Sequence, residues 1–308
     1  MLPAKQPTLY FVGVTTKSSS IMKVFPKWAK ALGLENTAIE GIDLPIRAPK
    51  EDYRRVAHFL KNDPLSLGAL VTTHKIDMFN AASDIFDYID PFAKELSELS
   101  CISKSGGKFC AHAKDPISSG LALENFVPEN FWKNRGGEVV LLGAGGSSLA
   151  MCLYFAQEKW GDNVPRVTIC NRSTPRLQSA KAHLAHVAKR LNLKFLHCPN
   201  PEDNDAVIAG LPAYSLVVNA TGLGKDAPGS PTTDNVTYPA NSLVWEINYR
   251  GDLIFMRQAQ ARAASKNLHV EDGWTYFIHG WTQVISEVFK IAIEGETLEK
   301  LSQIAKEA

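Results

Sequence analysis

The feature that most constrains the fold of this chain is a glycine turn that directly follows a short apolar strand. Residues 138–142 read Glu-Val-Val-Leu-Leu and run without a break into Gly143-Ala-Gly-Gly-Ser-Ser148, after which a helical pattern begins. Glycine lets the backbone approach a phosphate closely, and the first N–H groups of a helix carry a partial positive charge. Strand, turn and helix in this order predict a βαβ unit that cradles the pyrophosphate of a dinucleotide.

The same residues also fit a tight strand-to-helix turn without a ligand. The sixth position of the turn is Ser148, where a GxGxxG turn carries glycine. We favour the dinucleotide because the turn opens a βαβ unit. The residues expected to hold the pyrophosphate are Gly143, Ala144, Gly145, Gly146 and Ser147.

The residues at the end of the next predicted strand, 166–170, indicate which of two cofactors the chain would bind. An acidic side chain there would bind the ribose 2′-hydroxyl of NAD, whereas arginine accommodates the 2′-phosphate of NADP. The chain offers Asn171, Arg172, Ser173 and Arg176, with no acid among them. The sequence therefore favours NADP over NAD, the alternative being that Arg172 is simply a solvated residue after a strand.

From residue 8 onward, β-like runs alternate with helical patterns, which predicts an α/β fold with parallel sheets. The expected strands are 8–15, 38–44, 67–73, 138–142, 166–170, 194–197, 215–220 and 243–247, with a hairpin over 101–111 that turns at 105–107. The expected helices include one beginning near Pro26, then 53–61, 76–99, one from the glycine turn through about Lys159, 175–191, 253–266 and 275–293. A further turn is expected at Gly161-Asp162-Asn163.

Composition excludes several classes of function. The 33 basic and 32 acidic residues give a formal charge of +1, so no whole-molecule field attracts nucleic acid or an anionic membrane. No run approaches the roughly 18 apolar residues of a membrane span, and the first residues do not resemble a signal peptide, so a cytoplasmic location is expected. The five cysteines form no CxxC pair and lie mostly in apolar stretches, which predicts buried thiols and no metal site.

Six short segments together resemble the shikimate dehydrogenase family, in order and over nearly the whole length. The family's NVTxPxK is approximated by residues 70–75, GxNTD by 111–115, NRT by 171–173, NATxxG by 219–224, DxxY by 246–249 and DGxxMLxxQ by the segment from Asp272.

The resemblance implies a fold and an activity. It implies an α/β substrate domain over 1–118, a Rossmann-type doubly wound NADP domain over 119–272, and a helical segment over 273–308 that returns to the first domain. The implied reaction is the reversible, NADP-dependent oxidation of a ring hydroxyl of shikimate or a related cyclic hydroxy acid such as quinate. The chain would be a monomer or a homodimer. Further cofactor contacts would come from Asn219, Ala220, Thr221 and Gly222.

By the same resemblance, Lys75 and Asp115 are the catalytic pair. Oxidation of an alcohol requires a group that accepts the hydroxyl proton and steadies the developing negative charge. A lysine amine can do both, and a neighbouring carboxylate would orient it. From the residues alone, a solvated Lys75 and an Asp115 that caps a helix before Pro116 are the more ordinary interpretations, and only the match to the family's positions favours the catalytic pair.

The substrate residues implied are Ser18, Ser20, Thr72, Ser100 and Tyr249. The two early serines also fit a turn that caps a helix. Several family contacts are replaced: the family has polar side chains where this chain has Leu70, Ser100, Ala113 and Gly280. Because each lost hydrogen bond is worth on the order of 1 kcal/mol, the site is expected to hold shikimate differently from the family.

Two other functions therefore stay open. One is an oxidoreductase of this family that acts on a different substrate with fewer hydroxyls. The other is a dinucleotide-binding sensor without catalysis, against which the retention of Lys75 and Asp115 argues.

Overall fold

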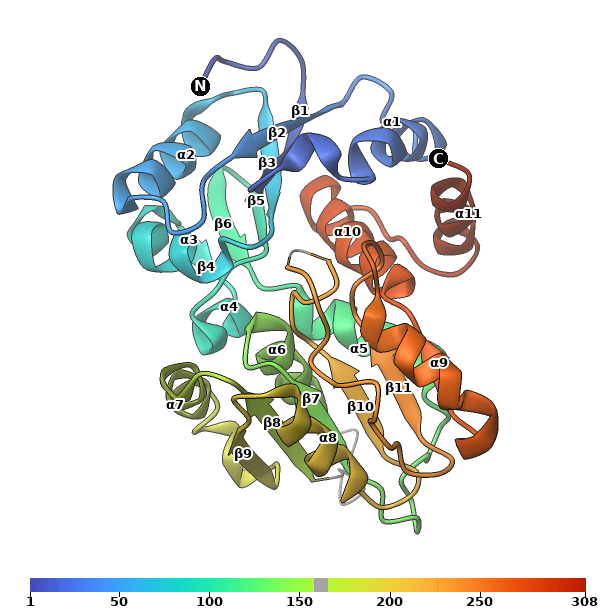
Figure 1. The fold of residues 1–308 in the computed structure, drawn as a ribbon. Helices are drawn as coiled ribbons and strands as arrows, with labels where there is room; N and C mark the ends of the chain where they lie inside the picture. The colour runs from blue at the N-terminus through green and yellow to red at the C-terminus, as the bar shows by residue number, and fades with distance from the viewer. Residues whose placement is uncertain (158–165, 226) are drawn as a thin grey trace. The chain divides into compact units, whose positions relative to one another are not determined.

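The computed structural model describes residues 1–157, 166–225 and 227–308. These residues form two compact units, each built around its own six-stranded sheet (Figure 1). The first unit comprises Met1–Lys114 and Gly280–Ala308, and the second comprises Asp115–His279. The predicted α/β class is confirmed. The assignment of substrate binding to 1–118, cofactor binding to 119–272 and a helical segment to 273–308 stays a prediction.

The sheet of the first unit is mixed, with the strand order β2-β1-β3-β5-β6-β4. Strands β1 (Thr8–Gly13), β2 (Ala38–Asp43) and β3 (Ser66–Val71) are parallel, and β1 is buried along its whole length. Strands β5 (Cys101–Ser105) and β6 (Lys108–His112) form the predicted hairpin. Gly106 and Gly107 both have positive φ angles, as a two-residue turn between antiparallel strands requires.

Helices cover both faces of this sheet (Figure 1). Helices α2 (Lys50–Asn62) and α3 (Lys75–Ala82) enclose an apolar core on one face. On the other, α1 (Ile21–Ala31) contacts the last helix, α11 (Gly295–Lys306), and the indole N–H of Trp28 donates to the carbonyl of Leu301 at 2.8 Å. The chain after residue 280 is thereby part of the first unit.

Two expectations for the first unit were wrong. Helix α1 begins at Ile21, so Pro26 lies inside it; the apolar face of Val24, Phe25 and Trp28 is fully buried, and this burial outweighs the one backbone bond that proline removes. The continuous helix over 76–99 is also absent. It is divided into α3, a short 3-10 helix (Ser83–Ile85), β4 (Tyr88–Ile89) and α4 (Pro91–Leu96).

Asp90-Pro91 explains this division. The Asp90 carboxylate accepts the backbone N–H of Ala93 at 2.6 Å and so starts a new helix, with Pro91 in its first turn. The preceding residues of β4 pair with β6 instead of continuing α3.

The sheet of the second unit is entirely parallel, in the order β12-β11-β10-β7-β8-β9. Its strands are β7 (Val139–Leu142), β8 (Val167–Asn171), β9 (Leu193–His197), β10 (Leu216–Asn219), β11 (Leu243–Glu246) and β12 (His269–Glu271). Its helices are α5 (Asp115–Phe126), α6 (Gly146–Phe155), α7 (Thr174–His183), α8 (Pro201–Ala209), α9 (Ile254–Lys266) and the start of α10 (Trp274–Phe289). The chain winds outward in one direction from β7 and in the other from β10, so the topological switch point lies between these two strands.

The predicted helix over 175–191 is shorter than expected. Helix α7 ends at His183, and a 3-10 helix follows at Val187–Lys189. Strand β12 and helix α8 were not anticipated, because each is short or mostly polar, whereas α11 lies within the segment 273–308 that was expected to be helical. The expected continuation of α6 through Lys159 and the turn at Gly161-Asp162-Asn163 lie outside the described residues.

Further properties of the chain concern its cysteines, its helices and its surface charge. All five cysteines are buried free thiols, as predicted.

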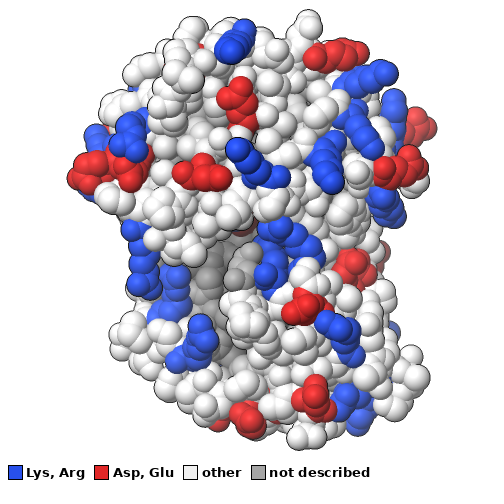
Figure 2. Space-filling view, turned by 45° about the horizontal axis from the view of Figure 1, so that its top comes forward, with Lys and Arg blue, Asp and Glu red and all other residues white. Residues whose placement is uncertain are grey.

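In the described parts of the chain, no helix is long and apolar enough to cross a membrane. Within the same residues, no group of three or more His, Cys, Asp or Glu side chains is placed to hold a metal ion. Basic and acidic side chains are interspersed over the face shown in Figure 2, in keeping with the near-zero net charge.

Candidate active site

The glycine turn of the second unit has the geometry that phosphate binding requires. Strand β7 ends at Leu142, and Gly143 has a φ angle of +111°; a Cβ there would lie 2.7 Å from the carbonyl oxygen of Ala220, so only glycine fits. Helix α6 then begins at Gly146 with no side-chain cap. Its first N–H groups are therefore not satisfied by a capping side chain and can serve an anion.

Ser148, the departure from the expected glycine pattern, has a structural role. Its hydroxyl donates to the carbonyl oxygen of Gly143 at 2.7 Å and so closes the turn. Ser148 is fully buried. The hydrogen bond replaces, in this chain, the close packing that a glycine would allow.

A pocket of about 390 Å³ opens beside this turn. Among the predicted cofactor residues, those that line it are Gly143, Ala144, Gly145, Asn171, Arg172, Arg176, Ala220, Thr221 and Gly222. The two arginines are the only charged side chains among the described lining residues. The pocket therefore presents two guanidinium groups to an anionic ligand.

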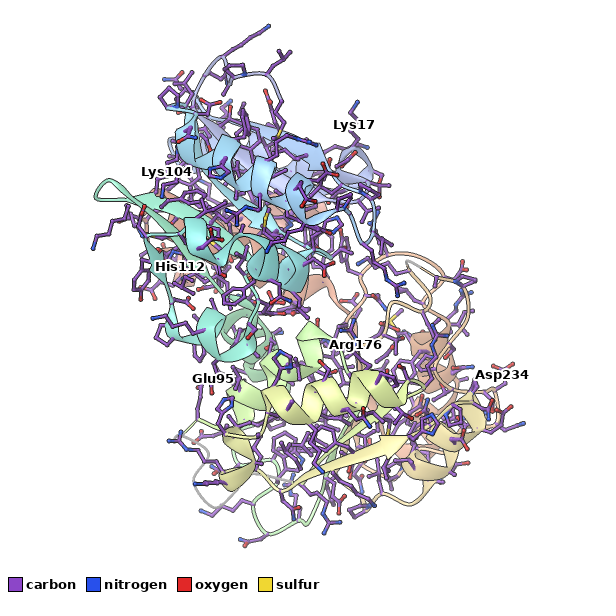
Figure 3. All side chains as sticks on the ribbon, turned by 90° about the vertical axis from the view of Figure 1, so that its left-hand side faces the viewer. Lys17, Glu95, Lys104, His112, Arg176 and Asp234 are labelled. Atoms are coloured by element: carbon purple, nitrogen blue, oxygen red, sulfur yellow. The ribbon has the colours of Figure 1, made fainter. Side chains whose placement is uncertain are left out.

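The turn after β8 is held by its own side chains. The amide Nδ2 of Asn171 donates to the carbonyl oxygen of Ser173 at 3.2 Å, and the Ser173 hydroxyl accepts the N–H of Arg176 at 3.5 Å. Ser173 thus caps α7, and Arg176 lies in the first turn of that helix (Figure 3). Arg172 and Arg176 are both exposed, so each can reach a ligand phosphate.

A buried carboxylate supports the far side of the pocket. The Oε2 atom of Glu246 accepts Nδ2 of Asn219 at 2.6 Å, and Oε1 accepts the N–H and Nδ2 of Asn248 at 2.9 and 2.7 Å. Asn219 in turn accepts the N–H and hydroxyl of Thr221 at 3.0 and 2.6 Å. The side chain of Asn219, predicted to bind the cofactor, is therefore used to position the segment that lines the pocket.

Glu246 is 0% exposed, and this burial raises its pKa from 4.5 to about 7 against the opposing effect of its hydrogen-bond donors. The match to the family's DxxY motif included Glu246 but implied no role for it. The position of Glu246 at the end of a short apolar strand, all of which is buried, was the available signal, because an acid in such a strand requires several donors.

The raised pKa of Glu246 predicts a specific pH dependence of stability. The folded chain keeps a proton that the unfolded chain releases between pH 4.5 and about 7. The stability that Glu246 contributes is therefore complete at low pH and is lost as pH rises through 7, to a total of about 3 kcal/mol. We expect the wild-type free energy of unfolding, measured against that of Glu246→Gln in urea, to fall by this amount from pH 4 to pH 8.

Glu202→Gln, at an exposed glutamate in the same unit, is the matched control. A wild-type minus Glu246→Gln difference that is the same at both pH values would contradict this assignment.

In the first unit, a tight turn places Lys75 at the first position of α3. Thr72 continues the sheet, its N–H donating to Val12 at 3.0 Å, and Thr73 then takes a φ angle of +32°, which is unusual for a β-branched residue. His74 is buried and holds the turn through Nε2 to the Leu44 carbonyl and Nδ1 to the Tyr53 hydroxyl, both at 3.1 Å. His74 is therefore an anchor, and Lys75 is half-buried beside it.

Backbone hydrogen bonds place Ser100 beside the turn that carries Lys75. Its carbonyl accepts the N–H of Val71 at 2.9 Å, while the carbonyl of Lys75 accepts the neighbouring N–H of Leu99 at 3.2 Å. The hydroxyl of Ser100 accepts the N–H of Lys114 at 2.8 Å, and Ser100 is buried. Ser100 thus positions the segment that leads to Asp115.

The remaining predicted residues are placed as follows. Ser18 is exposed and its hydroxyl donates to the Thr15 carbonyl at 2.8 Å, whereas Ser20 precedes α1 without capping it through its side chain. Asp115 is buried and begins α5, in the second unit. Tyr249, also in the second unit, packs against Phe277 with ring centroids 4.4 Å apart. The pairing of Lys75 with Asp115 stays a prediction.

Sequence reasoning missed a charged cluster around His112 in the first unit (Figure 3). The His112 ring lies 3.5 Å from the carboxylates of both Asp90 and Glu287, and its Nε2 is 2.9 Å from the Ser103 hydroxyl. Lys114 pairs with Glu287 at 2.6 Å. Burial opposes ionisation of Glu287, but hydrogen bonds from Lys114 and Lys290 lower its pKa to about 2.

This cluster joins α10 to the end of β6. The GxNTD match includes His112 and Lys114, but it did not reveal the cluster, because Glu287 lies far from both in the sequence. Ser103, His112 and Asp90 resemble a hydrolytic triad in type, yet Ser103 is 0% exposed, so its hydroxyl cannot reach a substrate.

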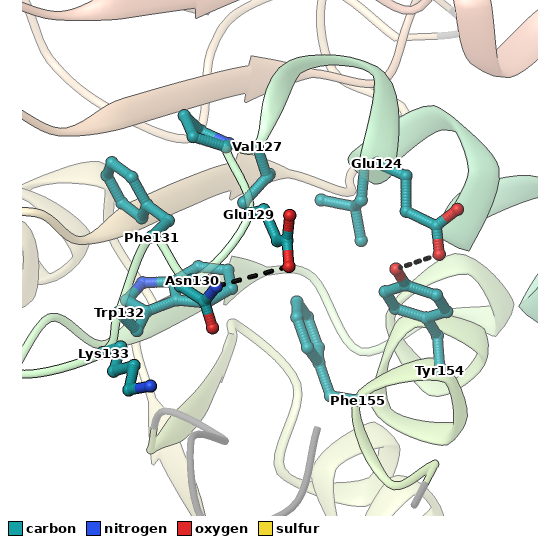
Figure 4. Close-up of a pocket in the computed structure, with 11 residues that line it drawn as sticks. Glu124, Val127, Glu129, Asn130, Phe131, Trp132, Lys133, Tyr154 and Phe155 are labelled. Carbon is teal, nitrogen blue, oxygen red and sulfur yellow. Dashed lines mark hydrogen bonds between the residues drawn. The ribbon is translucent and has the colours of Figure 1, made fainter. Parts of the chain in front are cut away.

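A second hollow in the second unit, of about 380 Å³, lies beside α5 and α6 (Figure 4). Its walls are largely apolar, and the hydroxyl of Tyr154 donates to Glu124 at 2.9 Å across one side. None of the predicted site residues lines it. The pocket beside the glycine turn is therefore the better candidate for a cofactor site.

Comparison with known proteins finds solved structures that share this fold. No family model matches the chain. The quinate dehydrogenase from Corynebacterium glutamicum, solved with NAD, superposes with a TM-score of 0.75 at 19% identity, covering 98% of this chain and 99% of that one. The shikimate 5-dehydrogenase from Thermus thermophilus, solved with NADP(H) and shikimate, gives 0.70 at 19%, covering 97% and 99%. The fold is that of these two-domain α/β proteins.

Sequence comparison also finds similarity to curated shikimate dehydrogenases. The chain is 24% identical to the shikimate dehydrogenase (NADP(+)) of Bacillus cereus (strain AH187) over 155 residues, which is 50% of this chain and 49% of that protein. The chain therefore matches about half the length of such curated relatives. The sequence and structure comparisons both find similarity to shikimate and quinate dehydrogenases, so the resemblance drawn from six short motifs is confirmed.

Proposed function

We propose that the chain is an NADP-dependent oxidoreductase that reversibly oxidises a ring hydroxyl of shikimate, quinate or a related cyclic hydroxy acid to the ketone. The observation that carries the proposal is the pocket beside Gly143, which combines a phosphate-binding turn with the guanidinium groups of Arg172 and Arg176. The names of the relatives, shikimate dehydrogenase (NADP(+)) and quinate dehydrogenase, support the substrate class.

The residues present fit NADP better than NAD. Arginine accommodates a 2′-phosphate, whereas the carboxylate that would bind a free 2′-hydroxyl is absent from the described lining of the pocket. Known structures of this fold contain either cofactor: that of the Corynebacterium protein holds NAD and that of the Thermus protein NADP(H). The preference of this chain therefore depends on its own arginines.

Replacing Arg172 tests this preference. A charge-assisted contact to phosphate is worth about 1.5–3 kcal/mol, so Arg172→Ala is expected to raise the KM for NADP by roughly ten- to a hundred-fold. The KM for NAD should change little. Steady-state kinetics with both cofactors measure the effect, and Arg190→Ala, at an exposed arginine outside the pocket, is the control. A wild-type enzyme that prefers NAD would contradict the proposal.

The chemistry assigned to the first unit centres on Lys75. Bound NADP supplies the acceptor for the hydride that leaves the substrate carbon. The amine of Lys75 would take the hydroxyl proton during oxidation and return it during reduction, and Asp115 would orient that amine. The position of Lys75 suits this role because its backbone is fixed. The side chain of His74 is bonded to the Leu44 carbonyl, and the N–H of Leu99 donates to the Lys75 carbonyl.

Lys75→Ala tests the catalytic assignment. Loss of a general acid–base group is expected to lower kcat by roughly a hundred- to ten-thousand-fold. The dissociation constant for NADP should stay close to that of the wild type, since the proposed cofactor residues lie in the second unit. Turnover from NADPH absorbance and cofactor titration give the two quantities. Lys50→Ala, at an exposed lysine of α2, serves as control, and near-normal turnover of Lys75→Ala would refute the role.

A different substrate is the second candidate, and specific replacements favour it. Ala113 is buried, the Ser100 hydroxyl is occupied by the Lys114 N–H, and an added Cβ at Gly280 would meet no atom within 4 Å. These positions offer fewer side-chain hydrogen bonds than the family pattern has. A substrate with fewer hydroxyls would leave fewer groups unpaired.

A panel of cyclic hydroxy acids, assayed for NADPH formation, separates the candidates. Turnover of shikimate or quinate supports the first proposal, and turnover only of less hydroxylated acids supports the second. Tight NADP binding without turnover of any compound would indicate a sensor.

A further inference from the structure

Two cysteines line the cofactor pocket side by side. Cys170 lies near the end of β8 and Cys198 directly follows β9, the neighbouring strand. Cys170 is paired with Leu196, and the N–H of Cys198 continues the ladder to the carbonyl of Asn171 at 3.0 Å. Because side chains alternate along a strand, both thiols lie on the same face of the sheet, where they share one apolar cluster with Ile208 of α8.

The two thiols are close enough to affect each other's ionisation. The interaction with Cys198, together with burial, raises the pKa of Cys170, and the interaction with Cys170 lowers the pKa of Cys198 against the effect of burial. Burial raises the pKa of each of the other three cysteines. Cys198 is therefore the most readily ionised thiol of the five, and its neighbour is another thiol.

We propose that Cys170 and Cys198 form a dithiol site that a hydroperoxide oxidises to a disulfide. The Cys198 thiolate attacks the terminal oxygen of the hydroperoxide, the O–O bond breaks, and the departing oxygen takes a proton to leave as water or an alcohol. Cys198 becomes a sulfenic acid. The sulfur of Cys170 then attacks the Cys198 sulfur, the S–S bond forms and water leaves with the thiol proton. Two thiols are oxidised and one hydroperoxide is reduced.

Formation of this disulfide would move the backbone at the arginine turn. Residues two positions out of register on neighbouring strands have Cα atoms about 8 Å apart, whereas a disulfide needs about 4.4–6.8 Å. Cys198 lies beyond the end of its strand, and Cys170 immediately precedes Asn171 and Arg172. The closure therefore displaces Arg172, and the strained bond is easily reduced again.

A consequence for cofactor binding rests on the proposed function. If Arg172 holds the 2′-phosphate, oxidation of the dithiol is expected to weaken NADP binding by about tenfold or more, and reduction should restore it.

The test uses the full chain treated with hydrogen peroxide and analysed without reductant. We expect the wild type to lose about 2 Da, to keep three of its five thiols, and to yield a Cys170–Cys198 linked peptide that dithiothreitol releases. In Cys170→Ser, the disulfide should be absent and a sulfenic acid at Cys198 should be trapped by dimedone. Cys198→Ser should give neither product. Cys152→Ser, at a buried cysteine outside the pocket, should behave like the wild type.

Five intact thiols in the wild type after peroxide, or a disulfide formed with any other cysteine, would overturn the dithiol site. Titration of NADP before and after oxidation tests the consequence separately. A reduced chain that binds no NADP would refute the proposed function and leave the dithiol chemistry standing, whereas a disulfide that leaves the NADP dissociation constant unchanged would refute the coupling.

Discussion

The absence of one side chain, at Gly143, is the constraint on which the candidate cofactor site depends. Only glycine allows the end of β7 to pass within contact distance of the Ala220 carbonyl and to turn directly into α6. This turn lies at the switch point of the parallel sheet, where the chain winds away in both directions. The position of the pocket is therefore a consequence of topology, and its chemistry is set by the segments that follow the strands.

Two polar networks support the predicted site residues, one in each unit. In the second unit, the buried carboxylate of Glu246 fixes the segments after β10 and β11. Asn219, which donates to Glu246, accepts a hydrogen bond from the Thr221 hydroxyl. In the first, His74 and Ser100 fix the backbone around Lys75 and Lys114. Both networks use buried polar groups that are hydrogen-bonded to the backbone, which fixes the backbone segments that carry the predicted side chains.

The sequence predicted the α/β class, the hairpin at Gly106 and the positions of the central strands, because these depend on local patterns of burial and turn residues. It could not predict that α1 includes Pro26 or that the 76–99 segment divides at Asp90, since distant packing against the sheet decides both. The roles of Glu246 and His112 were equally out of reach. Each depends on partners that are distant in the sequence or on a degree of burial that no motif encodes.

We propose that the chain oxidises a cyclic hydroxy acid with NADP and that the amine of Lys75 takes the proton of the reacting hydroxyl. A crystal structure of the chain with NADP and a cyclic hydroxy acid tests it most directly. We expect the pyrophosphate at Gly143, the 2′-phosphate on Arg172, and Nζ of Lys75 within hydrogen-bond distance of the hydroxyl on the carbon that faces the nicotinamide. A lysine amine directed into solvent, away from both molecules, would contradict it.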